Sequence, residues 1–311
     1  MAIAKKTAAM TAEREDIMKL FTRALAALVF FASPAFAQDA PLEVEVLQTS
    51  AGSLYANVVL IKGEEKAVLV DPPFTMADAH RAAAMVLDSG KELETIFVTH
   101  DHPDHFFAME VLTNAFPNAK VVAHPTVVED IWRSLPFKVK RWSPMLGDNG
   151  PKTPTAPAAL DGDVIMLEGH ELKVLGPMQG DHVHATALYA PSIGALFAGD
   201  LLFNEMYLWL GEHGRKETRA WGEAVDDLTA LEPEIVVPGH AKPGMPNDAS
   251  SLAYTGGFID FWLDATRKAK NSEELRAMVE EAYPDSIDVL DGFLLVNSSK
   301  VAMGEEPRWE E

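Results

Sequence analysis

The chain has 311 residues, 48% hydrophobic and 23% charged, which is typical of a globular protein with one sizeable α/β domain or two small ones. Its formal net charge of -21 argues against a nucleic-acid partner, since binding a phosphate backbone requires a basic surface. The chain contains no cysteine, which excludes disulfides, a thiolate nucleophile and cysteine-bound zinc. A metal ion would therefore be held by histidine, aspartate, glutamate, backbone oxygen or water.

The N-terminal residues have the pattern of a targeting segment. Lys19 and Arg23 precede a short apolar run at 24–32, and residues 35–37 (Ala-Phe-Ala) match an A-x-A cleavage site. The run is too short to span a membrane. We therefore expect a signal peptide cleaved after Ala37, export to a bacterial periplasm, and a single mature domain over residues 38–311 without a membrane span. An uncleaved N-terminal anchor is the alternative.

The first half of the mature chain predicts strands that alternate with helices. Strands are predicted at 42–48, 55–61, 67–70, 94–99 and 120–123, and helices at 76–87, 106–114 and 125–135. Residues 136–159 contain five prolines, which predicts a long irregular loop of the kind that flanks a functional site.

The second half predicts hairpins first and helices afterwards. The hairpins are expected at 164–175 and 185–198, a strand at 234–237, and helices at 218–231, 250–268 and 272–282. The last residues, rich in Glu and Pro, are expected to be loosely held. This order of elements predicts an α/β fold of two mixed sheets with helices outside, an αββα sandwich.

The densest group of chemically active residues directly follows the predicted strand at 94–99. It reads Thr99-His100-Asp101-His102-Pro103-Asp104-His105. Side chains alternate along a strand, so His100 and His102 point the same way, while Asp104 and His105 begin the next segment. Two imidazoles on one side, and a carboxylate with an imidazole on the other, suit one or two ions of zinc or a similar metal. The alternative is a polar turn that happens to be rich in histidine.

Three more segments place His or Asp beside a predicted strand. Gly180-Asp181-His182-Val183-His184-Ala185-Thr186 precedes one strand, and Ala198-Gly199-Asp200 and Pro238-Gly239-His240 each follow one. The ordered set H-x-H-x-D-H, G-x-H, A-G-D and P-G-H resembles the metallo-β-lactamase superfamily over roughly residues 42–270. The resemblance implies an αβ/βα sandwich with a metal cleft at one edge.

The resemblance also implies two sets of metal ligands. His100, His102 and His182 would hold the first ion, Asp104, His105 and His240 the second, and Asp200 would bridge the two. The family usually has G-H-x-x-x-S/T at the third motif. His182 lies four residues before Thr186 and fits this frame, whereas His184 does not. Because the usual Gly-His has become Gly-Asp-His, His184 stays open as the alternative, and Asp181 is expected to be a neighbour of the ligands.

The implied chemistry is hydrolysis by two Zn²⁺ ions, with iron or manganese as alternatives. Two such ions, about 3.5–4 Å apart, would share a bridging hydroxide that attacks an acyl or phosphoryl centre. Asp104 would also act as general acid and base, and Tyr207 would donate to the developing oxyanion. Asp71 and Asp101 are candidate acceptors for the second nitrogen of the ligand histidines, although Asp71 is equally well explained as a strand-end cap.

The leading hypothesis is a dinuclear zinc hydrolase for a small ester, lactone, thioester or amide. A β-lactamase is the runner-up. It ranks second because Asp at the bridging position resembles the superfamily's lactone, thioester and phosphoester hydrolases more than its β-lactamases. An iron-dependent oxygenase on the same fold and a non-catalytic metal- or ligand-binding protein are further alternatives. The sequence does not name the substrate, since loops rather than the fold set the pocket.

Overall fold

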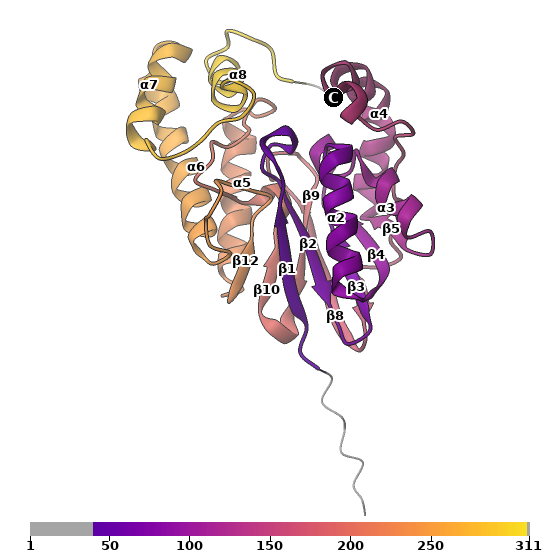
Figure 1. Ribbon diagram of the computed structural model, residues 1–311. Coiled ribbons are helices and arrows are strands. Elements are labelled where there is room, and N and C mark those ends of the chain that lie inside the picture. The colour runs from indigo at the N-terminus through magenta and orange to yellow at the C-terminus, as the bar shows by residue number, and fades with distance from the viewer. Residues whose placement is uncertain (1–39, 310–311) are drawn as a thin grey trace, which may run out of the picture. The chain divides into compact units, whose positions relative to one another are not determined.

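The computed structural model describes residues 40–309, so the predicted signal peptide and its cleavage site lie outside the described residues. Within the described part, two mixed sheets pack face to face and helices cover their outer faces (Figure 1). The predicted αββα sandwich is therefore confirmed. None of the helices between residues 40 and 309 is both long and apolar enough to cross a membrane.

The first sheet has the strand order β1-β2-β3-β4-β5-β6. Its strands are β1 (Glu43–Gln48), β2 (Asn57–Lys62), β3 (Lys66–Val70), β4 (Glu92–Val98), β5 (Lys120–Ala123) and β6 (Ala158–Ala159). The pairs from β1 to β3 are antiparallel, and those from β3 to β6 are parallel.

The second sheet has the order β12-β10-β9-β8-β7. Its strands are β7 (Val164–Leu167), β8 (His170–Met178), β9 (Ala185–Ala190), β10 (Ala195–Phe197) and β12 (Ile235–Val237). A separate parallel pair, β11 (Phe203–Asn204) with β13 (His240–Ala241), extends beyond this sheet.

The helices fall into two groups. Beside the first sheet lie α2 (Met76–Ser89), α3 (Met109–Ala115) and α4 (Pro125–Leu146); beside the second lie α5 (Arg215–Thr229), α6 (Ser250–Lys268), α7 (Ser272–Ala282) and α8 (Phe293–Ala302). Short 3₁₀ turns occur at Ala51–Ser53, Pro103–His105, Gly147–Asn149, Pro191–Ile193 and Gly199–Leu201.

Strand alternation builds the core in layers. In β2, Val59 and Ile61 pack against the second sheet, whereas Val58 and Leu60 face the other way, toward α2. Full burial of such side chains contributes about 1.5–3 kcal/mol each. Because both faces of the first sheet are buried, its register is strongly specified, and with it the position of the loop that follows β4.

Two regions differ from the sequence-based expectation. The loop expected at 136–159 begins with eleven further helical residues, because α4 continues through Pro136 and Pro144 to Leu146. Burial of Lys138 and Trp142 on the inner face of α4 offsets the hydrogen bonds that the prolines cannot donate. Helix α8 was not expected from the sequence, and the described residues that follow it are held by the packing of Trp309 against Trp209 instead of being loose.

The ends of the two sheets are tied together at one edge. Thr186, at the start of β9, donates from its backbone N and its Oγ1 to the carbonyl oxygen of Thr99, directly after β4. This contact brings the loop after β4 and the loop before β9 to the same place. The remaining two motifs, after β10 and after β12, reach this edge because β10 and β12 are parallel neighbours.

Candidate metal centre

Seven buried side chains converge at this edge in two groups. Within each group, one potential ligand atom from every residue lies within 4.8 Å of the others. The first group is His100, His102, Asp181 and Asp200; the second is Asp104, His105 and His240. Imidazole nitrogens and carboxylate oxygens in groups of three or four are the donors that zinc, iron and manganese bind in proteins.

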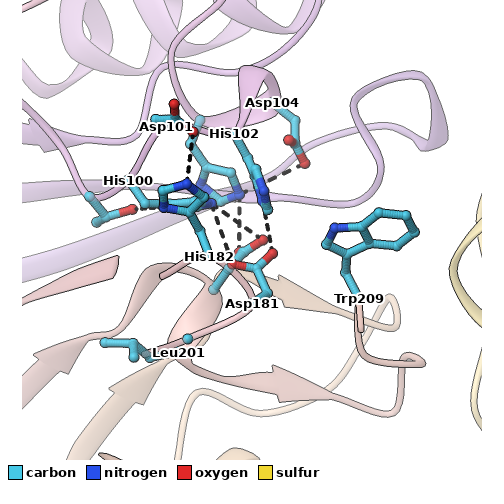
Figure 2. Close-up of polar contacts among 12 residues, drawn as sticks. His100, Asp101, His102, Asp104, Asp181, His182, Leu201 and Trp209 are labelled. Atoms are coloured by element: carbon cyan, nitrogen blue, oxygen red, sulfur yellow. Dashed lines mark hydrogen bonds and ion pairs between the residues drawn. The ribbon is translucent and has the colours of Figure 1, made fainter. Parts of the chain in front are cut away.

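The first group is arranged around a carboxylate. Asp181 Oδ2 lies 2.9 Å from His102 Nδ1, and Asp181 Oδ1 lies 3.8 Å from His100 Nε2. Asp200 Oδ2 lies 3.7 Å from the same nitrogen of His100. Figure 2 shows the Asp181 carboxylate turned toward the imidazole rings.

The second group is tighter and shares Asp200 with the first. His240 Nε2 lies 3.1 Å from Asp104 Oδ2 and 3.2 Å from His105 Nε2. Asp200 reaches both histidines, with Oδ1 3.1 Å from His105 Nε2 and Oδ2 3.2 Å from His240 Nε2. Gly239 allows this approach, because a Cβ there would lie 1.9 Å from Asp200 Oδ1.

Backbone and side-chain acceptors fix which nitrogen of each histidine faces the centre. Asp71 Oδ2 accepts from His105 Nδ1 at 2.9 Å, which confirms the expected role of Asp71 as a histidine partner. The Thr99 hydroxyl donates to the same carboxylate and therefore accepts from His100 Nδ1 at 2.9 Å. His240 Nδ1 donates to the carbonyl oxygen of Leu54. These three rings thus turn Nε2 toward the centre.

His102 is oriented by a residue that the sequence analysis missed. Its Nε2 lies 3.0 Å from Glu212 Oε1, which also accepts from Trp209 Nε1 at 3.0 Å. Burial would raise the pKa of Glu212, but the neighbouring His102 outweighs it and lowers that pKa to about 2. Glu212 is therefore an ionised acceptor that leaves Nδ1 of His102 facing Asp181.

The third position of the first group differs from the expectation. His182 Nδ1 accepts from the backbone N of His184, and its Nε2 lies 3.6 Å from Asp101 Oδ1. His184 pairs with Asp130 on α4 at 2.6 Å. Neither ring belongs to a group of possible ligands in the described chain, whereas Asp181 does. The sequence carried one sign of this, because Asp181 interrupts the expected Gly-His pair between Gly180 and His182.

Two other expectations take a different form. Tyr207 does not line the cavity; its hydroxyl donates to the carbonyl oxygen of Tyr283, and its ring packs near Phe258. Its position therefore gives no support to an oxyanion role. Asp101 accepts from Ser134 and from Lys138 of α4, not from a ligand histidine. It ties the histidine-rich loop to α4.

The donor set fits bound cations. His100 Nε2 and Asp181 Oδ1 are buried without a hydrogen-bond partner. Leaving such groups unsatisfied costs about 1–3 kcal/mol each, which a cation between them would remove. Burial and the nearby Asp200 raise the pKa of Asp181. Burial alone would raise the pKa of Asp200, but the neighbouring His105 and His240 outweigh this effect and lower the pKa. A cation would allow both carboxyl groups to stay ionised.

A cavity opens directly over the two groups. It encloses about 560 Å³, part of which is open to solvent. Its polar lining consists of His102, Asp104, Asp181, Asp200, Glu212 and His240, and the rest is apolar. A small organic molecule bound here would contact residues of both groups at once.

A family model described as the metallo-beta-lactamase superfamily matches residues 51–240. The chain belongs to the metallo-beta-lactamase superfamily. No curated protein matches the chain. All members of the two ligand groups fall inside the matched residues, so the superfamily's sequence pattern covers the whole candidate metal centre.

Several solved structures are similar to this chain in fold. A double mutant of the sec-alkyl sulfatase PisA1 is 17% identical with a TM-score of 0.59, over 87% of this chain and 51% of that one. A metallo-beta-lactamase from Pontibacter korlensis is 19% identical with a TM-score of 0.51, over 71% of this chain and 95% of that one. The DIM-1 metallo-beta-lactamase is 21% identical with a TM-score of 0.50, over 72% and 99%. At these identities the likeness shows the fold alone.

Proposed function

We propose that this member of the superfamily is a dinuclear, metal-dependent hydrolase that acts on a small ester, lactone, thioester or amide. The observation that carries the proposal is the contact of one carboxylate with both ligand groups. Asp200 lies 3.1 Å from His105, 3.2 Å from His240 and 3.7 Å from His100. A single cation would not require this shared residue.

The residues that would hold the two ions follow from the two groups. His100, His102 and Asp181 would hold one ion, Asp104, His105 and His240 the other, and Asp200 would contact both. When bound, zinc, iron or manganese at these positions would activate a water molecule and polarise the scissile carbonyl. We favour zinc because histidine provides most of the donors.

The chain's own residues supply orientation and proton transfer. In the reaction, a bond forms between the water oxygen and the carbonyl carbon, the bond to the leaving atom breaks, and one water proton passes to that atom. Asp104 is one of the carboxylates that line the cavity, and we assign the transfer of this proton to it. Asp71, Thr99 and Glu212 hold the imidazoles in place from behind. The apolar walls reduce access of bulk water.

The cellular location rests on the sequence pattern alone. We propose that the mature protein spans residues 38–311 and works in a bacterial periplasm after cleavage behind Ala37. N-terminal sequencing of the protein recovered from a periplasmic extract would give Gln38 as the first residue. An intact N-terminus in the cytoplasmic fraction would contradict this part of the proposal.

A substrate panel tests the reaction type. The zinc-loaded protein is offered an aryl ester, an acyl-homoserine lactone, a thioester, a phosphotriester and the β-lactam nitrocefin. We expect metal-dependent cleavage of at least one of the first three. Cleavage of nitrocefin alone would favour the β-lactamase alternative, and the absence of any cleavage with two metal ions bound would favour a binding protein. One tightly bound iron with no hydrolysis would favour an oxygenase.

A further inference from the structure

Five aromatic side chains form one side of the cavity above the metal centre. We call this set the aromatic wall: Phe74, Trp142, Trp209, Phe293 and Trp309. The Trp209 ring stacks on Phe293 with 5.0 Å between the centroids and 11° between the planes. Trp309 meets both rings edge-on, at 5.0 Å and 5.1 Å. Such packing holds the rings in fixed positions.

The C-terminal part of the chain supplies two residues of this wall and two further apolar residues of the cavity. Val289, Phe293, Leu294 and Trp309 all line the cavity and lie beyond residue 240, where the match to the superfamily ends. The segment after α8 runs toward α4 (Figure 1) and is anchored by the bond from Trp309 N to the carbonyl oxygen of Gly211. Phe293 and Trp309 thus come from outside the matched residues, whereas Phe74, Trp142 and Trp209 lie within them.

The charged groups of the cavity lining also bear on which substrates can bind. Four carboxylates line the cavity, Asp104, Asp181, Asp200 and Glu212, and no lysine or arginine does so within the described residues. Two divalent cations would balance those four negative charges and leave none in excess. Arg141 stacks on Trp309, with its guanidinium 3.6 Å from the ring centroid, but does not line the cavity. Beyond the two metal ions, an anionic substrate would therefore find no lysine or arginine in the lining to pair with.

We propose that this cavity selects uncharged esters or lactones that carry an aromatic or bulky apolar group, which lies against the aromatic wall, and that it discriminates against anionic substrates. The inference rests on the proposed function for the reaction and adds the substrate class. The apolar wall stabilises the substrate through burial and ring contacts, while an added carboxylate would lose its hydration without gaining a partner.

A matched pair of esters tests the charge discrimination. Methyl 4-acetoxybenzoate is neutral and 4-acetoxybenzoate is an anion, and both carry the same acetyl group. Each ester's kcat/KM is divided by its rate constant with hydroxide, which corrects for intrinsic reactivity. We expect the corrected value to be about tenfold higher or more for the neutral ester, because the carboxylate of the anion would lose its hydration without gaining a partner. Equal values, or a preference for the anion, would overturn the inference while leaving the hydrolase proposal intact.

Binding to the metal-depleted full-length protein tests the wall without any turnover. By calorimetry, methyl 4-hydroxybenzoate is expected to bind, and about tenfold more weakly to Trp309→Ala and Phe293→Leu, because these changes remove ring contacts. Trp132→Ala is the matched control, since Trp132 is 59% exposed on α4. Circular dichroism checks that each variant is folded. Unchanged binding in both wall variants would overturn the inference. Wall-dependent binding without hydrolysis of any compound in the substrate panel would uphold the binding preference and contradict the proposed function.

Discussion

The Asp181 carboxylate lies 2.9 Å from Nδ1 of His102, in the ligand group where the sequence predicted His182. Each ligand group therefore contains two histidines and one aspartate, with Asp200 shared between them. A carboxylate in place of a neutral imidazole adds one negative charge to the centre and makes its first half a harder donor set, which is more favourable to manganese or iron than a three-histidine set.

Replacing Asp181 tests this assignment. We expect Asp181→Asn to lose one of two bound metal ions per chain, because the first group would keep only two histidines and the shared Asp200. His182→Asn is the matched control and should keep both ions, since His182 faces Asp101 and His184. Metal content measured by mass spectrometry decides between them. Metal loss in the His182 variant with full loading of the Asp181 variant would restore the histidine expected from the sequence.

Removing Glu212 tests the support behind His102. Glu212→Ala leaves Nε2 of His102 without its acceptor, and we expect the metal dissociation constant of the first site to rise about 10–100-fold. The same variant frees Trp209 Nε1, so the aromatic wall should also loosen. Glu223→Ala, an exposed change on α5, serves as the control. Competition with a chelator gives the constants, and equal affinities in both variants would count against the role of Glu212.

The buried pair of Asp101 and Lys138 makes a stability prediction. Lys138 is fully buried and lies 2.7 Å from Asp101 Oδ1. Lys138→Met is expected to lower the free energy of unfolding by about 3–5 kcal/mol, because it leaves the Asp101 charge buried without its main cation. Adding Asp101→Asn should recover part of this loss. Urea unfolding of both variants measures it, and a double variant less stable than Lys138→Met would refute the pairing argument.

Asp78 gives a pH dependence away from the metal centre. Burial would raise the pKa of Asp78, but hydrogen bonds from Ser50, Ser53, Arg81 and Thr75 outweigh it and lower the pKa below its ordinary 3.8. The stabilisation is therefore complete above pH 3.8 and disappears as the pH falls through the lower pKa of the folded state.

The corresponding variant is Asp78→Asn. We expect it to cost about 1–3 kcal/mol at pH 7, the value of hydrogen bonds to a charged group, and less as the pH approaches and passes below 4. Asp88→Asn, an exposed change at the other end of α2, should have little effect on the free energy of unfolding at pH 7 or below pH 4. Urea unfolding at several pH values measures both, and a pH-independent loss would show that the charge of Asp78 is not the cause.

Much of the fold and site follows from local patterns. The apolar runs of β2, β3 and β4 and the dense histidine loop after β4 are readable because strand alternation and metal ligation each leave a short-range pattern. Asp200 and His240 are found for the same reason, since each sits directly after a predicted strand.

The remaining features depend on contacts between distant residues. Asp181 and His182 are adjacent in the sequence. Only the three-dimensional position of the loop before β9 turns Asp181 toward His102. The helical course of α4 past Pro136 depends on the burial of Lys138 and Trp142. Trp309 reaches Trp209 across 100 positions of sequence, which no local pattern encodes.

The central claim is that one centre of two cations, joined by Asp200, performs hydrolysis. Its most direct test is the metal content of the purified full-length protein, measured together with ester hydrolysis, for the wild type, Asp200→Ala and His102→Ala. We predict two divalent ions per chain and metal-dependent hydrolysis in the wild type, with reduced metal content and loss of activity in both variants. Full activity in either variant, or in wild-type protein stripped of metal, would contradict the claim.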